Sequence, residues 1–167
     1  KMIEIMKAKQ EDSLQIAIVN VYTWKTQYSG LMKDETINFR IKNVENSSEK
    51  IKKRINEDGN YLVAKKDNTV IGFCRYGKCQ EKGYEDFGQI NALYLLEGFK
   101  GKGIGKRLFE EAKKEIKNMG YSKMRIDCLK GNPTLGFYLH MGGKVVSEFE
   151  HTFVEEKIKE EIIEFEI

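Results

Sequence analysis

The sequence predicts an α+β domain with a central mixed, mostly antiparallel sheet of about seven strands flanked by helices. Three observations support this class. Short segments in which apolar and polar residues alternate recur along the chain and are separated by segments with helical spacing. Two pairs of alternating segments are joined by short turns, which indicates antiparallel neighbours. One glycine-rich loop follows a strand directly and runs into an amphipathic helix.

Composition and length indicate one folded domain over residues 1–167. Apolar residues make up 40% of the chain and aromatic residues 11%, enough to build a core. A net charge of +3 without a basic and aromatic patch argues against binding to nucleic acid. The longest apolar run is too short to span a membrane, and no signal peptide opens the chain, so we expect a cytoplasmic protein without membrane contact. Cys74, Cys79 and Cys128 lack metal or redox spacing and are expected to be reduced thiols, with no metal site.

The chain begins with a predicted strand and a helix. Ile3 and Ile5 recur with the period of two that is typical of a strand. Asp12 or Ser13 can cap the helix that follows. The apolar face of this helix is expected to consist of Leu14, Ala17, Ile18, Val21 and Tyr22.

Two more helices and a hairpin are expected next. Residues 34–41 have the length and composition of a short helix. Asn46 with Glu49 three residues later resembles a capping box, and we expect a third helix from there to Asp58-Gly59, with Ile51 and Ile55 on its apolar stripe. Strands 61–65 and 70–79 are expected to pair through a turn at residues 66–69.

The second half alternates strands and helices. We expect a strand at 86–96, a helix from Ile104 to Met119, a strand at 123–129, and a short helix after Asn132-Pro133 that ends at Gly142 and Gly143. Residues 145–154 and 161–167 are expected to form an antiparallel pair that closes the sheet.

Residues 93–108, at the junction of strand and helix, have the composition of a phosphate site. Helix starts favour acidic residues, because free backbone N–H groups carry partial positive charge there. Here four basic residues occupy this end, and the glycines between them leave the backbone uncovered: Lys100, Lys102, Lys106 and Arg107, with Gly101, Gly103 and Gly105. Exposed N–H groups and cations together favour a bound phosphate. The alternative is a set of solvated lysines on a flexible turn.

Two common phosphate motifs do not fit this loop. A Walker loop requires Ser or Thr after Gly105-Lys106, where this chain has Arg107, and a glycine where it has Lys100. A dinucleotide fingerprint requires its third glycine one residue later. The segment Lys100-Gly101-Lys102-Gly103-Ile104-Gly105 instead resembles the acetyl-CoA pyrophosphate loop of the GNAT N-acetyltransferase superfamily, Gln/Arg-x-x-Gly-x-Gly/Ala. Lys100 departs from the usual Gln or Arg, which keeps a donor but loses its planar geometry.

A second segment resembles the same superfamily about 30 residues later. Residues 132–143, from Asn132 to Gly143, are similar to the signature Asn-x-x-Ala-x-x-Phe-Tyr-x-x-x-Gly, with a departure at the Ala position. Asn132 could serve only as a helix cap, and Tyr138 only as a core residue. The resemblance implies a GNAT-like acyl-CoA N-acyltransferase fold and a single N-acetyltransferase domain over residues 1–167.

A third segment, Trp24-x-x-x-Tyr28-x-Gly-Leu31, resembles an element that lies beside the acceptor pocket in one branch of the superfamily. The resemblance implies an enclosed apolar pocket formed by Trp24, Tyr28 and Leu31. The alternative is a helix that packs its aromatic residues on the core.

The resemblance also implies a mechanism in which a primary amine attacks the thioester of acetyl-CoA directly and CoA is the product. The loop amides from Gly101 to Lys106 would hold the pyrophosphate, and the strand backbone at Leu93, Tyr94 and Leu95 would hold the pantetheine arm and the thioester oxygen. Tyr138 would be the general acid, with Asn132 near the cofactor.

The general base is left open by the sequence. Gln89 and Asn91 share one face of the strand and could hold a water, whereas Glu85 at the strand entrance could be a base or merely solvated. A hairpin rich in glutamate could attract a cationic amine or protect a sheet edge; its acidic residues are Glu148, Glu150, Glu155, Glu156, Glu160 and Glu161. We expect a small-molecule amine acceptor and a possible homodimer. A non-catalytic acyl-CoA sensor and a protein or peptide N-acetyltransferase are the alternatives.

Overall fold

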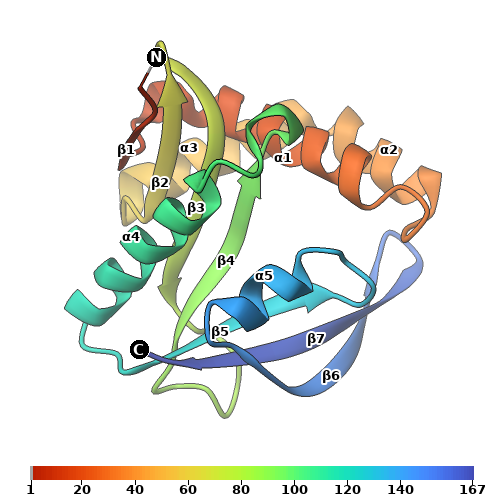
Figure 1. Cartoon of the computed structure of the whole chain (residues 1–167). Helices are drawn as coiled ribbons and strands as arrows, with labels where there is room; N and C mark the ends of the chain where they lie inside the picture. Colours follow the sequence, from red (N-terminus) through yellow and green to blue (C-terminus); the bar gives the residue numbers. More distant parts are fainter. Residues whose placement is uncertain (1) are drawn as a thin grey trace.

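The computed structural model describes residues 2–167 and contains the predicted order of elements (Figure 1). The strands are β1 Glu4–Lys7, β2 Tyr61–Lys66, β3 Thr69–Lys78, β4 Gly88–Leu95, β5 Lys123–Leu129, β6 Lys144–Phe153 and β7 Glu156–Glu166. The helices are α1 Ser13–Gln27, α2 Asp34–Lys42, α3 Val44–Glu57, α4 Ile104–Asn118 and α5 Leu135–His140, with short 3-10 turns at Gln10–Asp12 and Glu97–Phe99.

The sheet has seven strands in the order β1-β2-β3-β4-β5-β7-β6, and it is split in the middle. Every neighbouring pair is antiparallel except β4 and β5, which run parallel. These two strands pair only where Gly88, Gln89 and Ile90 face Met124, Arg125 and Ile126. Beyond Ile90 they diverge, as Figure 1 shows, so the far end of β4 has a free backbone edge.

Helices cover both faces of the sheet. On one face, Leu108 and Phe109 of α4 pack with Tyr138 of α5 in the larger core. On the other face, Ile16 of α1 and Ile51 of α3 pack against the strands in a second core. The sheet is therefore the middle layer of three, and its split opens between the helical layers.

The wide end of the split is closed by a contact between α2 and the β6–β7 hairpin. A third apolar cluster there contains Tyr28, Met32, Ile37, Leu129 and Ile158. The carboxylate of Glu156, at the start of β7, accepts a 2.6 Å hydrogen bond from the Thr36 hydroxyl and a 3.1 Å bond from the Lys33 backbone N–H. These contacts join segments that lie far apart in the sequence (Figure 1).

The predicted apolar face of α1 is confirmed at Ala17, which is buried, and is wrong at Leu14, Ile18 and Tyr22, which are between 43% and 49% exposed. Ile16 and Val19 are buried in their place. The helix is rotated because α3 and the sheet pack on it from two sides, which also buries Thr23. The Thr23 hydroxyl donates to the Val19 carbonyl at 2.8 Å, so a polar residue can occupy this position without losing a hydrogen bond.

Several predicted boundaries also move. Helix α3 begins at Val44 after Asn43, so Asn46 lies inside the helix and does not cap it. Strand β7 begins five residues earlier than predicted, because the hairpin turn at Val154 and Glu155 adopts positive φ and lets pairing start at Glu156. Met119 follows the end of α4 and is largely exposed.

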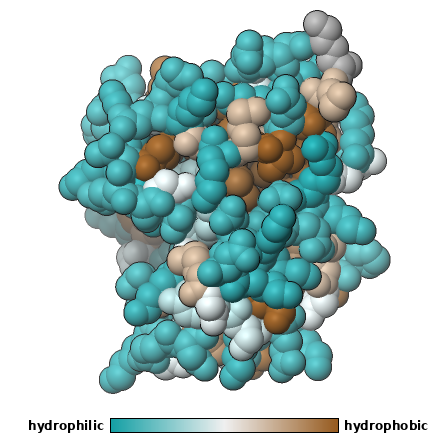
Figure 2. Space-filling view, turned by 90° about the vertical axis from the view of Figure 1, so that its left-hand side faces the viewer, coloured by the Kyte–Doolittle hydropathy of each residue, from teal (hydrophilic) through white to brown (hydrophobic). Residues whose placement is uncertain are grey.

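The molecular surface is mainly polar on the face that Figure 2 shows, with only small apolar areas between charged side chains. Over residues 2–167, no helix combines the length and the apolar composition that a membrane crossing requires.

Candidate active site

The loop between β4 and α4 exposes backbone N–H groups at the start of a long helix. Gly103 is the N-cap of α4 with φ of +78°, a conformation that only glycine adopts without strain. Within residues 2–167, no side chain caps the free N–H groups of the first turn. Lys100 and Lys106 border the cavity beside this loop. The Lys100 ammonium also lies 2.9 Å from the Glu97 carboxylate, and the Arg107 guanidinium donates to the Ile3 carbonyl at 3.1 Å. Among the described residues, Lys106 is therefore the cation with the fewest competing contacts at this end.

A cleft of about 710 Å³ extends from this loop along the free edge of β4 to α5. Leu93, Leu95, Pro133 and Phe137 provide apolar walls at one end, and the glycines of the loop form the other. The side chain of Ile104 is in the core, and Lys102 lies over the Phe99 ring. These two residues therefore contribute their backbone groups to the loop, and not their side chains. The cleft therefore suits a long ligand that carries phosphate at one end and an extended amide chain at the other.

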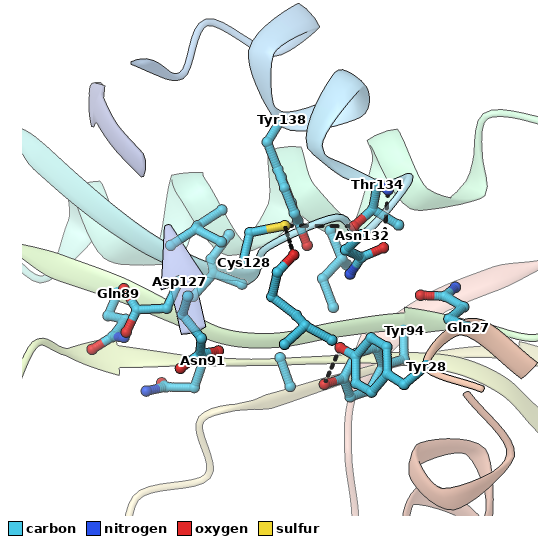
Figure 3. A pocket seen from close by; sticks show the side chains of 16 residues that line it. Gln27, Tyr28, Gln89, Asn91, Tyr94, Asp127, Cys128, Asn132, Thr134 and Tyr138 are labelled. Carbon is cyan, nitrogen blue, oxygen red and sulfur yellow. Dashed lines mark hydrogen bonds between the residues drawn. The ribbon is translucent and has the colours of Figure 1, made fainter. Parts of the chain in front are cut away.

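A smaller inner pocket of about 180 Å³ lies where β4 and β5 diverge (Figure 3). It shares walls with the cleft at five residues: Gln27, Leu93, Tyr94, Thr134 and Tyr138. Figure 3 shows Tyr138 pointing from α5 toward Asn132 and Cys128, with Gln89, Asn91 and Asp127 grouped on one side. The two cavities therefore meet at Tyr138.

The Tyr138 phenol is buried at this junction. Burial raises the pKa of Tyr138 well above the usual value for a phenol, and the nearby Cys128 and Tyr94 side chains raise it further. Among the described residues, no side chain hydrogen-bonds to its hydroxyl group. The phenol is therefore protonated at neutral pH and free to donate to a ligand.

The predicted helix cap at Asn132 is wrong, because α5 begins at Leu135 with Thr134 as its N-cap, and Pro133 is not the first helical residue. The side-chain oxygen of Asn132 instead accepts a 3.0 Å hydrogen bond from the Thr134 backbone N–H in the turn before the helix. Asn132 lines the inner pocket, whereas Pro133 and Thr134 line the cleft.

The inner pocket is also lined by two carboxylates that the sequence did not indicate as catalytic. Asp127 on β5 lies 2.7 Å from the buried Arg125, which holds it as an ion pair. Glu160 on β7 lies 2.9 Å from the ring of His151. Burial and the charge of Asp127 raise the pKa of Glu160. Alternation did place Arg125 and Asp127 on one face, but nothing local indicated that β7 brings Glu160 beside them.

Of the three polar residues proposed for proton handling, the structure brings two to the pocket. Gln89 and Asn91 both line it. A β-bulge at Asn91, where Arg75 faces Ala92 and Tyr76 faces Ile90, changes the alternation of β4 at this point. Glu85 is outside, in an exposed turn, where its carboxylate accepts the Gly83 N–H at 3.1 Å and this bond lowers its pKa. The structure therefore does not bring Glu85 to the site.

The expected apolar acceptor pocket is not formed. Tyr28 lines the inner pocket, Trp24 lines a different cavity on the other side of β4, and Leu31 is largely exposed beside Gly131. Most side chains of the inner pocket are polar, because they come mainly from β4, β5, β7 and the segment that leads into α5, and only Gln27 and Tyr28 come from the end of α1.

Comparisons with known proteins agree with this arrangement. Residues 23–142 match the model of the acetyltransferase (GNAT) family. The chain is 32% identical over 161 residues to spermidine N(1)-acetyltransferase of Thermoplasma acidophilum, covering 93% of this chain and 96% of that protein. It is 27% identical over 161 residues to YuaI, an uncharacterized N-acetyltransferase of Bacillus subtilis, covering 95% and 90%. The crystal structure of the PaiA N-acetyltransferase of Thermoplasma acidophilum in complex with coenzyme A superposes over the full length of both chains, with a TM-score of 0.80 and 27% identity.

The family match covers well over half of the chain, and it includes the β4–α4 loop and the segment from Asn132 to Gly142. The chain belongs to the GNAT family of acetyltransferases and is an N-acetyltransferase.

Proposed function

We propose that this N-acetyltransferase moves the acetyl group of its cosubstrate, acetyl-CoA, directly to the primary amine of a small molecule, and that residues 1–167 act as one such domain. The observation that carries the proposal is the position of the Tyr138 phenol where the long cleft meets the inner pocket. The relative named for spermidine supports a small amine as the acceptor. The inner pocket, at about 180 Å³, has room for an amine-bearing group of a few atoms.

In this proposal the cleft holds the cosubstrate. The N–H groups from Gly101 to Lys106 bind the pyrophosphate, because the start of α4 carries partial positive charge that no side chain neutralises. The free backbone edge at Leu93, Tyr94 and Leu95 pairs with the pantetheine amides. A backbone N–H at Leu95 or its neighbour faces the thioester oxygen, where it stabilises negative charge that develops during attack.

Tyr138 assists the departure of the sulfur. The thioester supplies an acetyl group that leaves a thiolate behind, and this thiolate needs a hydrogen-bond donor. Burial keeps the phenol protonated, and the raised pKa makes complete loss of its proton costly. The hydroxyl group therefore acts first as a hydrogen-bond donor to the sulfur, and the proton follows as charge builds on that atom.

The amine must lose a proton before it attacks, since an alkylamine has a pKa near about 10.4. Glu160 is the carboxylate that we assign to receive it. Its raised pKa makes it a stronger base than a solvated glutamate, whereas Asp127 is neutralised by Arg125. Gln89 and Asn91 hold the water through which the proton passes from the ammonium group to Glu160.

Calorimetric titration with acetyl-CoA and CoA, followed by thiol release across a panel of primary amines, tests this function. We expect cofactor binding and amine-dependent release of CoA. Cofactor binding without release on any amine would favour an acyl-CoA sensor. The absence of binding would overturn the assignment of the cleft.

A further inference from the structure

A third cavity, of about 340 Å³, lies on the α1–α3 side of β4 and is strongly basic. Its charged lining residues come from three different elements: Arg40 of α2, Lys50 and Arg54 of α3, and Arg75 of β3. We refer to this cavity as the arginine pocket. Among the described residues, no aspartate or glutamate lines it, and none of these four cations is within ion-pair distance of a carboxylate. None of the residues that line the cavity supplies a counter-charge, and the charge of Asp58, which acts on Arg75, comes from outside the lining.

The guanidinium groups are held in place by aromatic rings and not by acids. Arg40 lies 5.0 Å from the centre of the Trp24 ring, and Arg75 lies 6.0 Å from that of Tyr61. A cation–π contact of this kind stabilises the position of the guanidinium group without using its N–H groups, which stay available for an anion. The Nε atom of Arg40 is buried and has no hydrogen-bond partner in the described chain, which is costly unless a ligand accepts a hydrogen bond from it.

The arginines also repel one another. Burial lowers the pKa of both Arg40 and Arg75, and the charge of Arg54 lowers each of them further. A bound anion would relieve this repulsion and satisfy the buried donor at the same time. The arrangement is therefore that of a binding site.

The arginine pocket adjoins the inner pocket. Asn91, Ala92 and Tyr94 line both cavities, and they lie on the part of β4 that has no neighbour on the β5 side. From Asn91 to Tyr94 the strand advances only about 10 Å. A short molecule can therefore reach around this free edge and occupy both cavities.

We propose that the arginine pocket binds an acidic group, a carboxylate or a phosphoryl group, of the same acceptor whose amine enters the inner pocket. This inference rests on the proposed function. The two cavities differ in charge: Glu160 faces the amine, with Asp127 beside it paired to Arg125, and Arg40, Arg54 and Arg75 face the acid. The acceptor is then a zwitterion of amino-acid size, and a linear polyamine without an acidic group is a poor substrate.

Direct binding can be measured because Trp24, the only tryptophan of the sequence, lines the arginine pocket. Protein saturated with CoA, which occupies the loop of α4, is titrated with inorganic phosphate and separately with acetate while tryptophan fluorescence is followed. We expect a saturable change with at least one anion, weakened about tenfold or more in Arg54→Gln and in Arg75→Gln. Lys52→Gln, an exposed change on α3 outside the pocket, is the matched control and should bind as the parent does. A change that is not saturable, or that both arginine variants retain, would overturn the proposal.

Rates of acetylation provide a second test of the proposal. Thiol release is compared for pairs of amines that differ only in the acidic group, such as an amino acid and its amide, or an aminoalkyl phosphate and the aminoalcohol. We expect kcat/KM to favour the acidic member about tenfold or more, and this preference to disappear in Arg75→Gln. Equal rates for the two members, or a preference for polyamines, would overturn the proposal. If no amine is turned over, the proposed function fails, and the fluorescence titration still decides whether the anion site exists.

Discussion

The hydroxyl oxygens of Tyr28 and Tyr94 lie 3.3 Å apart and join the end of α1 to the free edge of β4. Tyr28 lines the inner pocket, and Tyr94 lines the cleft, the inner pocket and the arginine pocket. Burial raises the pKa of both phenols, so both are neutral and one donates to the other. This pair therefore forms the wall at which the cleft, the inner pocket and the arginine pocket meet.

Removal of the Tyr138 hydroxyl group tests the proposed role of this residue as the general acid. In Tyr138→Phe we expect kcat to fall about 10²-fold or more, because the leaving thiolate loses its donor, while the affinity for CoA stays unchanged. Steady-state kinetics and calorimetry measure the two quantities. Tyr22→Phe removes an exposed hydroxyl from α1 and is the control. Equal losses in CoA affinity and in rate would show that Tyr138 is only a wall of the cleft.

Because burial raises the pKa of Tyr138, the parent should show no loss of rate up to about pH 9 from ionisation of this phenol.

Replacement of the Glu160 carboxylate tests the proposed role of this residue as the general base. In the parent, kcat/KM should fall as pH drops through the pKa of Glu160, and burial places this limb above the usual range for a carboxyl group. In Glu160→Gln the plateau should fall about 10²-fold and the limb should disappear. Glu150→Gln, on an exposed position of β6, is the control and should keep both. A pH profile that is unchanged in Glu160→Gln would contradict the assignment.

Glu160→Gln is expected to lower the activity but not the stability of the fold. A raised pKa means that the fold prefers the protonated carboxyl group, so the contribution of Glu160 is fully present at low pH and is lost as pH rises through its folded pKa. At neutral pH, Glu160→Gln should therefore unfold at a urea midpoint no lower than that of the parent. A clear loss of stability would indicate that the pair with His151 is structural and outweighs the cost of burial.

A buried ion pair at the start of α1 should be important for stability. The Lys65 ammonium lies 2.8 Å from the Asp12 carboxylate, and both side chains are largely removed from solvent. In Asp12→Asn we expect a loss of about 3 kcal/mol in the free energy of unfolding, because Lys65 is left buried without its counter-charge. Asp86→Asn breaks an exposed pair with Lys123 at 3.8 Å and should change little. Urea unfolding of both variants measures the difference, and equal effects would contradict it.

Gly88 is required where β4 passes under α4. A methyl group at this position would lie 2.3 Å from Cγ2 of Ile116, closer than packed carbon atoms approach. We expect Gly88→Ala to cost about 2 kcal/mol in the free energy of unfolding, since the helix or the strand must move. Gly98→Ala, where a methyl group meets no atom within 4 Å, is the control for thermal unfolding. A melting temperature for Gly88→Ala equal to that of the control would contradict the prediction.

Local features of the sequence predicted most of the fold. The order of strands and helices follows from periodicity and turns, and the β2–β3 hairpin follows from Asp67 and Asn68, which both adopt positive φ. The sequence also predicted the β4–α4 loop and the helix of Tyr138, because each motif consists of residues that are close together in the chain. The assigned roles of these residues remain predictions.

The rotation of α1, the placement of Glu160 and the arginine pocket were decided only by the tertiary structure. Arg40, Arg54 and Arg75 come from α2, α3 and β3, and each looks like an ordinary surface cation in its own segment. Their grouping depends on how α1 and α3 pack on the sheet, and the position of Glu160 depends on how β7 pairs beyond the split. By itself, the sequence determined the elements and the motif that marks an acetyltransferase. The charges that line the inner pocket and the arginine pocket were decided by long-range packing, because periodicity reports which residues share a face and not which faces meet.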